Sequence, residues 1–398
     1  MARSSAATTP VAFLCLIAAA GRWAANAFPR SPIGASLGSE HVVEEWGWTP
    51  GADRRGAARS SSVLSGGGPS SGSAAGKGGD EVDHSPSLTV VGQDNGVLIG
   101  VGRLVMRVAN AGGRITSCKI DGVETLTQAD SQAAESGATF WTSPQADWGW
   151  PPPAAIDTGH YSAKFGEGLV KVTADEDISL RDTTVSVSKT FRPAGANAIE
   201  VVYDVTNTGE SDVTMAGWQV TRVDRGVTFY PTGQGATPAS SFEMNTSLGY
   251  SWATYPGVAQ KNFGDGAGGW LAHAQTVAST GVLLLQQFED IGAAQFAPGE
   301  SEIELYGDPG GLYMELECQG PYTFVRGGGT LSWSVIWKGE VLGAGTAIAE
   351  GSADLADAAE RLKGQDAREQ GRVLLSLPRQ LTWGGQDGVS RDRMQHRW

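Results

Sequence analysis

Tryptophans gather in one short proline-rich stretch of the sequence, FWTSPQADWGWPPP (140–153). Proline fixes φ and drives the preceding residue toward extended geometry, so we expect a stiff, extended loop rather than a helix or a central strand. Residues two apart share one side of an extended chain, so Trp148 and Trp150 should present their indoles together. An indole has an apolar face and an N–H donor, which suits a sugar, and Trp141 and Gln145 would complete the platform. The alternative is that these indoles only cover the end of a core.

A second stretch, YMELECQG (313–320), alternates between polar and apolar residues, as expected of a strand with one face in a core. Its polar face carries Tyr313, Glu315, Glu317 and Gln319. A tyrosine, two carboxylates and an amide can bind sugar hydroxyls and transfer protons. A solvated outer face is the commoner reason for such alternation, and it remains the alternative.

The stretch WQVTRVD (218–224) places Trp218 and Arg222 on one side of a predicted strand. This pair suits either a binding cleft or a structural arginine that stacks on tryptophan and pairs with a carboxylate, and the second interpretation is favoured. Only His160 and His273 fall among the predicted strands, so these two histidines are the available proton shuttles near neutral pH. A single histidine in a strand is more often structural.

The elements that must position these residues are predicted to be strands. From Leu88 to about Val341, short runs rich in Val, Ile, Thr and aromatic residues alternate with Gly, Asn, Asp and Pro. Hairpin-like turns join them, and no long helical crossovers are found, which predicts an all-β domain of antiparallel sheets over 88–341. In the remaining segment, 342–398, apolar spacing over 352–365 predicts one short amphipathic helix, followed by a polar tail.

The N-terminal segments are predicted to carry targeting information rather than structure. Residues 1–27 combine a positive start, the apolar run VAFLCLIAAA and a small-residue cleavage site, which together predict a secretory signal peptide. The apolar run is too short to span a bilayer, so we expect a secreted protein without a membrane partner once the signal is removed. The junction NAFPRSP leaves plastid targeting by a bipartite signal as an alternative. Residues 28–87 are rich in Gly and Ser and predict a disordered linker.

Composition and spacing exclude several classes of function. The net charge of −14 and the pI near 4.8 argue against a nucleic-acid partner, because such proteins concentrate Lys and Arg on one face. No His or Cys cluster has the spacing of a metal site, and no phosphate loop or dinucleotide motif is present, so no metal and no cofactor are predicted. Cys118 and Cys318 could pair in an oxidising compartment, but two buried free thiols are favoured.

Five segments in a fixed order resemble a known family. They are GGRITSCKIDGVETL, FWTSPQADWGWPPP, WQVTRV, APGESEIELY and ELECQGPYTF…GGGTLSWSVIW. Over about Gly96 to Lys338 the chain resembles an uncharacterised, mostly secreted family of the galactose-mutarotase-like superfamily. Its most specific part is the FWxSPQxxWGWPPP motif, in which Thr142 stands where the family pattern has proline. The resemblance implies an antiparallel β-supersandwich whose concave face binds carbohydrate.

The resemblance and the residues together support one main hypothesis and two alternatives. The main hypothesis is a secreted carbohydrate-binding sandwich that binds a mono- or polysaccharide, with its catalysis and oligomeric state left open. The first alternative is an aldose epimerase-like enzyme, in which Glu317 or Glu315 would be the base and His273 or His160 the acid. The second alternative is a purely structural or interaction sandwich.

Overall fold

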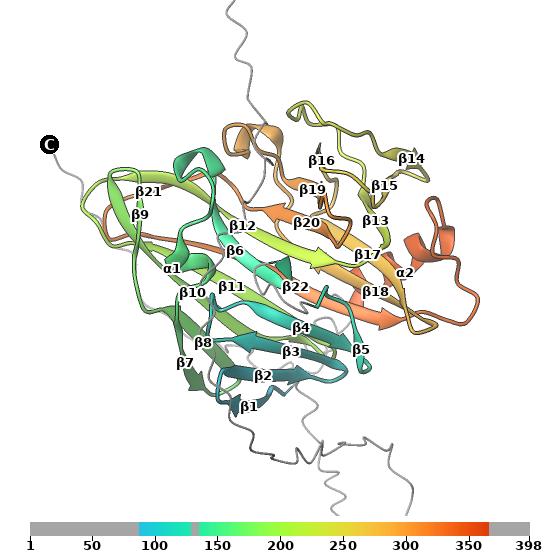
Figure 1. The fold of residues 1–398 in the computed structure, drawn as a ribbon, viewed down its shortest axis with the longest axis horizontal. Helices are drawn as coiled ribbons and strands as arrows, with labels where there is room; N and C mark the ends of the chain where they lie inside the picture. Colours follow the sequence, from blue (N-terminus) through green and yellow to red (C-terminus); the bar gives the residue numbers. More distant parts are fainter. Residues whose placement is uncertain (1–86, 129–134, 366–398) are drawn as a thin grey trace, which may run out of the picture. The chain divides into compact units, whose positions relative to one another are not determined.

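The computed structural model describes residues 87–128 and 135–365 (Figure 1). The described residues all belong to one compact unit. The predicted signal peptide, the predicted linker up to residue 86 and the tail after residue 365 lie outside the described residues. No helix in the described ranges has the length and apolar character needed to cross a bilayer.

The described residues form two antiparallel sheets of eleven strands each. The first has the order β1-β2-β3-β4-β6-β12-β20-β19-β16, with β5 paired to β4 and β21 paired to β12. Its strands are β1 (Thr89–Gln93), β2 (Gly96–Val101), β3 (Leu104–Ala109), β4 (Ile115–Ile120), β5 (Val123–Glu124), β6 (Ala138–Ser143), β12 (Val213–Val223), β16 (Gln260–Gly264), β19 (Ile303–Gly307), β20 (Met314–Gln319) and β21 (Thr323–Val325).

The second sheet has the order β14-β15-β13-β17-β18-β22-β11-β10-β8-β7, with β9 paired to β10. Its strands are β7 (Tyr161–Gly166), β8 (Leu169–Ala174), β9 (Ile178–Leu180), β10 (Thr183–Gly195), β11 (Ala198–Asn207), β13 (Gly226–Pro231), β14 (Asn245–Ser247), β15 (Tyr250–Thr254), β17 (Trp270–Val277), β18 (Thr280–Gln287) and β22 (Thr330–Val341). The short helical elements are the 3₁₀ turns η2 (Gln145–Asp147) and η3 (Ala293–Gln295) and the α-helices α1 (Ala154–Asp157) and α2 (Ala353–Lys363).

The main core lies between the two sheets. Phe140 of β6 stacks on Tyr203 of β11, with ring centroids 4.3 Å apart, and the Tyr203 hydroxyl donates to Gln219 of β12. The amide of Gln286 on β18 donates to the hydroxyl of Thr221 on β12. Successive strand residues point to opposite faces, so the neighbours of these residues on β6 and β12 face away from the second sheet. We call that side of the first sheet the outer face.

Helix α2 packs beside β18 and β22 (Figure 1). Its apolar side chains, including Leu355, join Phe229, Trp252 and Trp270 in a second buried cluster. The Ser352 hydroxyl caps its first turn by accepting from the Leu355 N–H. The predicted fold class, two antiparallel sheets with one short C-terminal helix, is therefore confirmed.

The two cysteines of the described region are buried free thiols. Cys118 lies on β4 and Cys318 on β20, and both are fully shielded from solvent. Burial raises the pKa of the Cys118 thiol to about 12, so the thiol stays protonated at neutral pH. The favoured alternative of two free thiols is confirmed.

Candidate functional site

Strand register brings the residues predicted from three separate stretches onto the outer face. Trp218 of β12 lies opposite Trp141 of β6 on one side and opposite Gln319 of β20 on the other. Further along the same strand, Arg222 lies opposite Glu315. The alternation of side chains then puts Glu317 on the same face, between Glu315 and Gln319.

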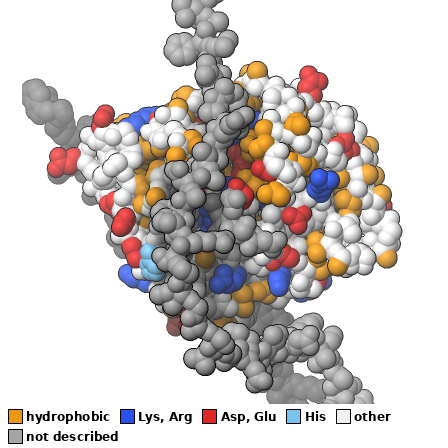
Figure 2. All heavy atoms as spheres, viewed as in Figure 1, with side chains coloured by type: hydrophobic (Ala, Val, Ile, Leu, Met, Phe, Trp, Pro, Cys, Tyr) orange, Lys and Arg blue, Asp and Glu red, His pale blue; other side chains and the backbone are white. Residues whose placement is uncertain are grey.

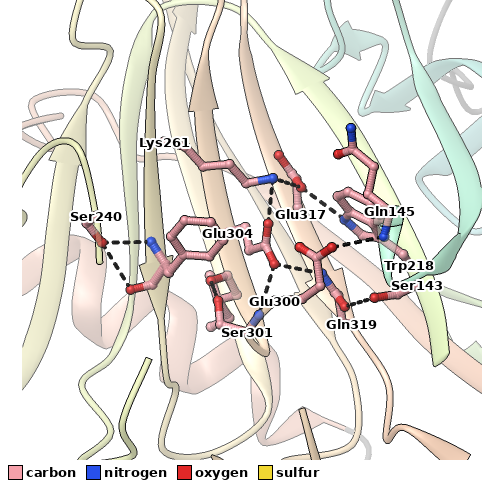
Figure 3. Close-up of polar contacts among 12 residues, drawn as sticks. Ser143, Gln145, Trp218, Ser240, Lys261, Glu300, Ser301, Glu304, Glu317 and Gln319 are labelled. Carbon is pink, nitrogen blue, oxygen red and sulfur yellow. Dashed lines mark hydrogen bonds and ion pairs between the residues drawn. The ribbon is translucent and has the colours of Figure 1, made fainter. Parts of the chain in front are cut away.

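A buried ion network lies on this face across β20, β19 and the edge strand β16 (Figure 3). The Lys261 ammonium of β16 lies 2.5 Å from Glu304 Oε2 and 3.2 Å from Glu317 Oε2. The Trp218 indole N–H donates to Glu317 Oε2 over 2.9 Å, and the ammonium lies 5.0 Å from the Trp218 ring centroid. Glu304 and Glu317 are 0% and 1% exposed. We call Lys261, Glu304 and Glu317 the lysine–carboxylate cluster.

Burial and mutual attraction set the charge states in this cluster. Burial by itself would lower the pKa of Lys261, but the nearby carboxylates of Glu304 and Glu317 outweigh burial and raise it. Burial raises the pKa of Glu304 well above its usual range, although Lys261 opposes the rise. Lys261 is therefore a permanent cation whose charge holds together two desolvated acidic side chains.

Hydrogen bonds extend the network from the sheet to the tryptophan-containing loop. The Gln319 amide donates to Glu304 Oε1 over 2.7 Å and accepts from the Ser143 hydroxyl over 2.6 Å. At the start of the loop, the Gln145 backbone N–H donates to Glu300 Oε1 over 2.9 Å. Figure 3 shows the side-chain amide of Gln145 projecting away from these contacts, with no polar contact to the other residues drawn. That amide remains available for other partners.

A second ion pair lies beside the cluster. Arg222 Nη2 is 2.8 Å from Glu315 Oε1, and its guanidinium lies between the rings of Trp141 (5.9 Å) and Tyr313 (5.5 Å). Burial raises the pKa of Glu315, while Arg222 opposes the rise. This is the arrangement of the favoured interpretation, a structural arginine stacked on tryptophan and paired with a carboxylate.

The tryptophan-containing loop is not extended, so that prediction is wrong. Residues 145–147 form the 3₁₀ turn η2, and Gly149 adopts a φ of +71°, which favours glycine. The indoles of Trp148 and Trp150 nevertheless both reach Trp141, at centroid distances of 5.8 and 6.1 Å with edge-on geometry. Trp148 also donates its N–H to the Thr142 carbonyl and is half-buried, whereas Trp150 is 70% exposed. The loop thus combines one largely structural indole with one that faces solvent.

Ion pairs anchor this loop at both ends, a buried one at Asp157 and a partly exposed one at Asp147. Asp157 Oδ1, in α1, accepts from the Trp141 indole N–H and from Arg114 Nη2, each over 2.9 Å. Near the start of the loop, Asp147 Oδ1 lies 2.6 Å from Arg181 Nη2, which comes from the turn before β10 in the second sheet. The position of the exposed Trp150 indole is therefore defined by contacts to both sheets.

The two predicted histidines lie away from this network. His273 is 1% exposed and lies opposite Leu284, a member of the core between the sheets, with its Nδ1 2.9 Å from the Thr228 hydroxyl. Burial lowers its pKa to about 4, so it is neutral at neutral pH. His160, largely exposed beside β7, has its Nδ1 2.6 Å from Asp175 Oδ2. The structure therefore does not bring together the glutamate and histidine that the epimerase alternative requires.

The polar side chains of YMELECQG lie on the outer face of the first sheet, but they are not solvated. All six residues of β20 are buried, and its carboxylates are used within the molecule. Three residues of the network, Lys261, Glu304 and Glu300, were not predicted from the sequence, because they lie outside the tryptophan-rich and histidine-containing stretches. For Glu304 a sequence pattern exists: SEIELY (301–306) alternates polar and apolar residues as YMELECQG does, which predicts a strand with a polar face. In residues 87–128 and 135–365 no group of three or more His, Cys, Asp or Glu side chains could hold a metal ion.

Comparisons with known proteins relate the chain to others by fold. No protein-family model and no curated protein matches it. Similar solved structures include a putative aldose 1-epimerase from Escherichia coli K12, with 12% identity and a TM-score of 0.41 over 65% of this chain and 100% of the other. A galactose mutarotase-like protein from Lactobacillus casei has 10% identity and a TM-score of 0.39 over 64% and 100%. A putative mutarotase from Salmonella typhimurium has 12% identity and a TM-score of 0.40 over 65% and 96%. At these values the likeness concerns the fold alone and assigns neither a family nor an activity.

Proposed function

We propose that the outer face of the first sheet binds carbohydrate, with Trp150 as the stacking residue. The observation that carries this proposal is the 70% exposure of an indole that is nonetheless held edge-on against the buried Trp141. A rigid aromatic side chain loses little conformational entropy when it binds, and its face suits the apolar side of a sugar ring. The half-buried Trp148 would add a second apolar surface next to it.

Polar groups beside the two indoles can bind sugar hydroxyls. The Lys261 ammonium has three N–H donors, of which two face Glu304 and Glu317, and its side chain is 23% exposed. The side-chain amide of Gln145 and the half-buried carboxylate of Glu300 lie in the same network and add a donor and acceptors. Because contacts within the protein already hold Lys261 and Glu300, little ordering of these two side chains would be needed on binding.

The proposal is a binding function rather than epimerase catalysis. An epimerase of the Glu–His type would need a histidine next to Glu317, and the contacts found for His160 and His273 are to Asp175 and Thr228. The predicted export signal in residues 1–27 further leads us to propose a secreted protein, which would meet glycans outside the cytoplasm.

Replacement of the exposed indole tests this proposal. Trp150→Ala should weaken binding to the best ligand of an oligosaccharide panel by at least about fivefold, because central aromatic anchors commonly contribute more than 1 kcal/mol. The matched control is Phe165→Ala, which removes an aromatic side chain that is 60% exposed on β7 of the other sheet. Calorimetric titration measures the affinity, and circular dichroism melting checks that both variants fold.

Two results would contradict the proposal. One is the absence of binding by the unmodified protein to every neutral, acidic and amino sugar in the panel. The other is equal affinity of the folded Trp150→Ala and Phe165→Ala variants for the ligand that the unmodified protein binds.

A further inference from the structure

The arginines near the proposed carbohydrate-binding face are already matched by acidic side chains. Arg222 pairs with Glu315, Arg181 with Asp147, and Arg114 with Asp157, at 2.8, 2.6 and 2.9 Å. Among the described residues, these three pairs leave no excess arginine charge beside the lysine–carboxylate cluster; Arg107, on β3 toward the other edge of the sheet, bonds to the uncharged side chains of Gln93 and Thr116.

The lysine–carboxylate cluster carries more negative than positive charge. Its one cation, Lys261, lies within salt-bridge distance of both Glu304 and Glu317. A third carboxylate, Glu300, accepts the Gln145 backbone N–H and is close enough to act electrostatically on both Lys261 and Glu304. With all three glutamates ionised, two negative charges are in excess. Burial raises the pKa of Glu304, and with that residue protonated one negative charge is still in excess.

We propose that this face selects among sugars by charge: amino sugars bind more tightly than neutral sugars, and neutral sugars more tightly than uronates. This inference rests on the proposed carbohydrate-binding function and names the substrate class of that site. The face drawn in Figure 2 shows acidic side chains among apolar ones, together with Lys and Arg side chains. An ammonium group on a ligand bound beside the cluster would gain from the uncompensated carboxylates, whereas a carboxylate bound there would find only arginines that already pair with acidic side chains.

Coulomb's law gives the size of the effect. For a unit ligand charge roughly 7 Å from one uncompensated carboxylate, the affinity should change between about threefold and about fiftyfold, for effective dielectric constants of about 80 and about 20. The net charge of −14 of the whole chain acts in the same direction but at longer range. Salt at physiological ionic strength, with a Debye length of about 8 Å, screens most of that longer-range contribution.

Calorimetric titration with three oligosaccharides of equal length and linkage tests the inference. The probes are oligomers of glucosamine, glucose and glucuronate, measured in physiological salt at a pH that keeps glucosamine protonated. The unmodified protein should bind them in that order, with at least about a threefold step between neighbours. Glu300→Gln, which retains an acceptor for the Gln145 N–H, should reduce the ratio of glucosamine to glucuronate affinity by at least about threefold. The control Glu167→Gln, in the exposed turn between β7 and β8, should leave the ratio unchanged.

The outcomes separate this inference from the proposed function. If glucuronate binds as tightly as glucosamine, the charge selection is wrong while carbohydrate binding stands. If a folded Glu300→Gln variant keeps the original ratio of glucosamine to glucuronate affinity, the assignment of charge selection to Glu300 and the adjoining lysine–carboxylate cluster is overturned. If none of the three oligomers binds, both the proposed function and the selection fail.

Discussion

The lysine–carboxylate cluster makes a strong prediction for the substitution Lys261→Met. Methionine has a length similar to that of lysine but carries no charge, so it leaves Glu304 and Glu317 desolvated without their cation. Both carboxylates are almost completely buried. Breaking a buried ion pair by removing one partner typically costs about 3–5 kcal/mol, because the remaining charge is uncompensated. Against a typical domain stability of about 5–15 kcal/mol, this loss should be large and easily measured.

The loss of stability caused by Lys261→Met should also depend on pH. Without Lys261, the pKa of Glu304 should rise further, because burial then acts without the opposing cation. The folded variant would hold a proton that the unfolded chain releases above its ordinary carboxyl pKa of about 4.3. Its free energy of unfolding should therefore fall as the pH rises from there, by up to about 1.4 kcal/mol per pH unit for this carboxyl group. The variant should be closest to the unmodified protein in acid.

Urea unfolding followed by tryptophan fluorescence at mildly acidic and mildly alkaline pH measures both effects. Lys164→Met, which removes an exposed lysine of β7, is the matched control and should change stability little. The double variant Lys261→Met with Glu304→Gln should recover part of the loss, because it removes one of the two stranded charges. A loss below about 1 kcal/mol, or a pH dependence equal to that of the control, would refute the view that Lys261 neutralises buried carboxylates.

Two further predictions concern buried groups elsewhere in the core. Burial, reinforced by Arg114, lowers the pKa of Lys189 to about 7, below its unfolded value of 10.5. Between these two pH values the unfolded chain binds more protons than the folded protein, so the free energy of unfolding, measured with urea, should rise with pH. The substitution Lys189→Met should remove this rise. A rise of equal size in that variant would show that Lys189 does not cause it. The thiols of Cys118 and Cys318 should not react with a thiol reagent in the native protein, and both should react after denaturation. If the denatured protein reacts only after treatment with a reducing agent, the two cysteines form a disulfide instead.

Much of the site's composition could be predicted from alternation within single strands. The period of two in YMELECQG and WQVTRVD correctly places Glu315, Glu317 and Gln319 on one face of β20, and Trp218 with Arg222 on one face of β12. The punctuated runs of β-branched residues likewise predict antiparallel sheets and a C-terminal helix. These features follow from the local geometry of the chain, because neighbouring side chains of a strand point to opposite sides.

Tertiary structure alone decided which of these residues meet and how deeply they are buried. Lys261 reaches Glu317 across 56 residues of sequence because β16 and β20 both pair with β19, and no local pattern encodes that register. Residues outside the strand made the polar face of β20, for which a solvated surface was the alternative, into a desolvated ion network. His273, on β17 of the second sheet, is buried in the core between the sheets. Strand pairing depends on hydrogen bonds and core packing between distant segments, so the charge balance of the site follows from the assembled fold.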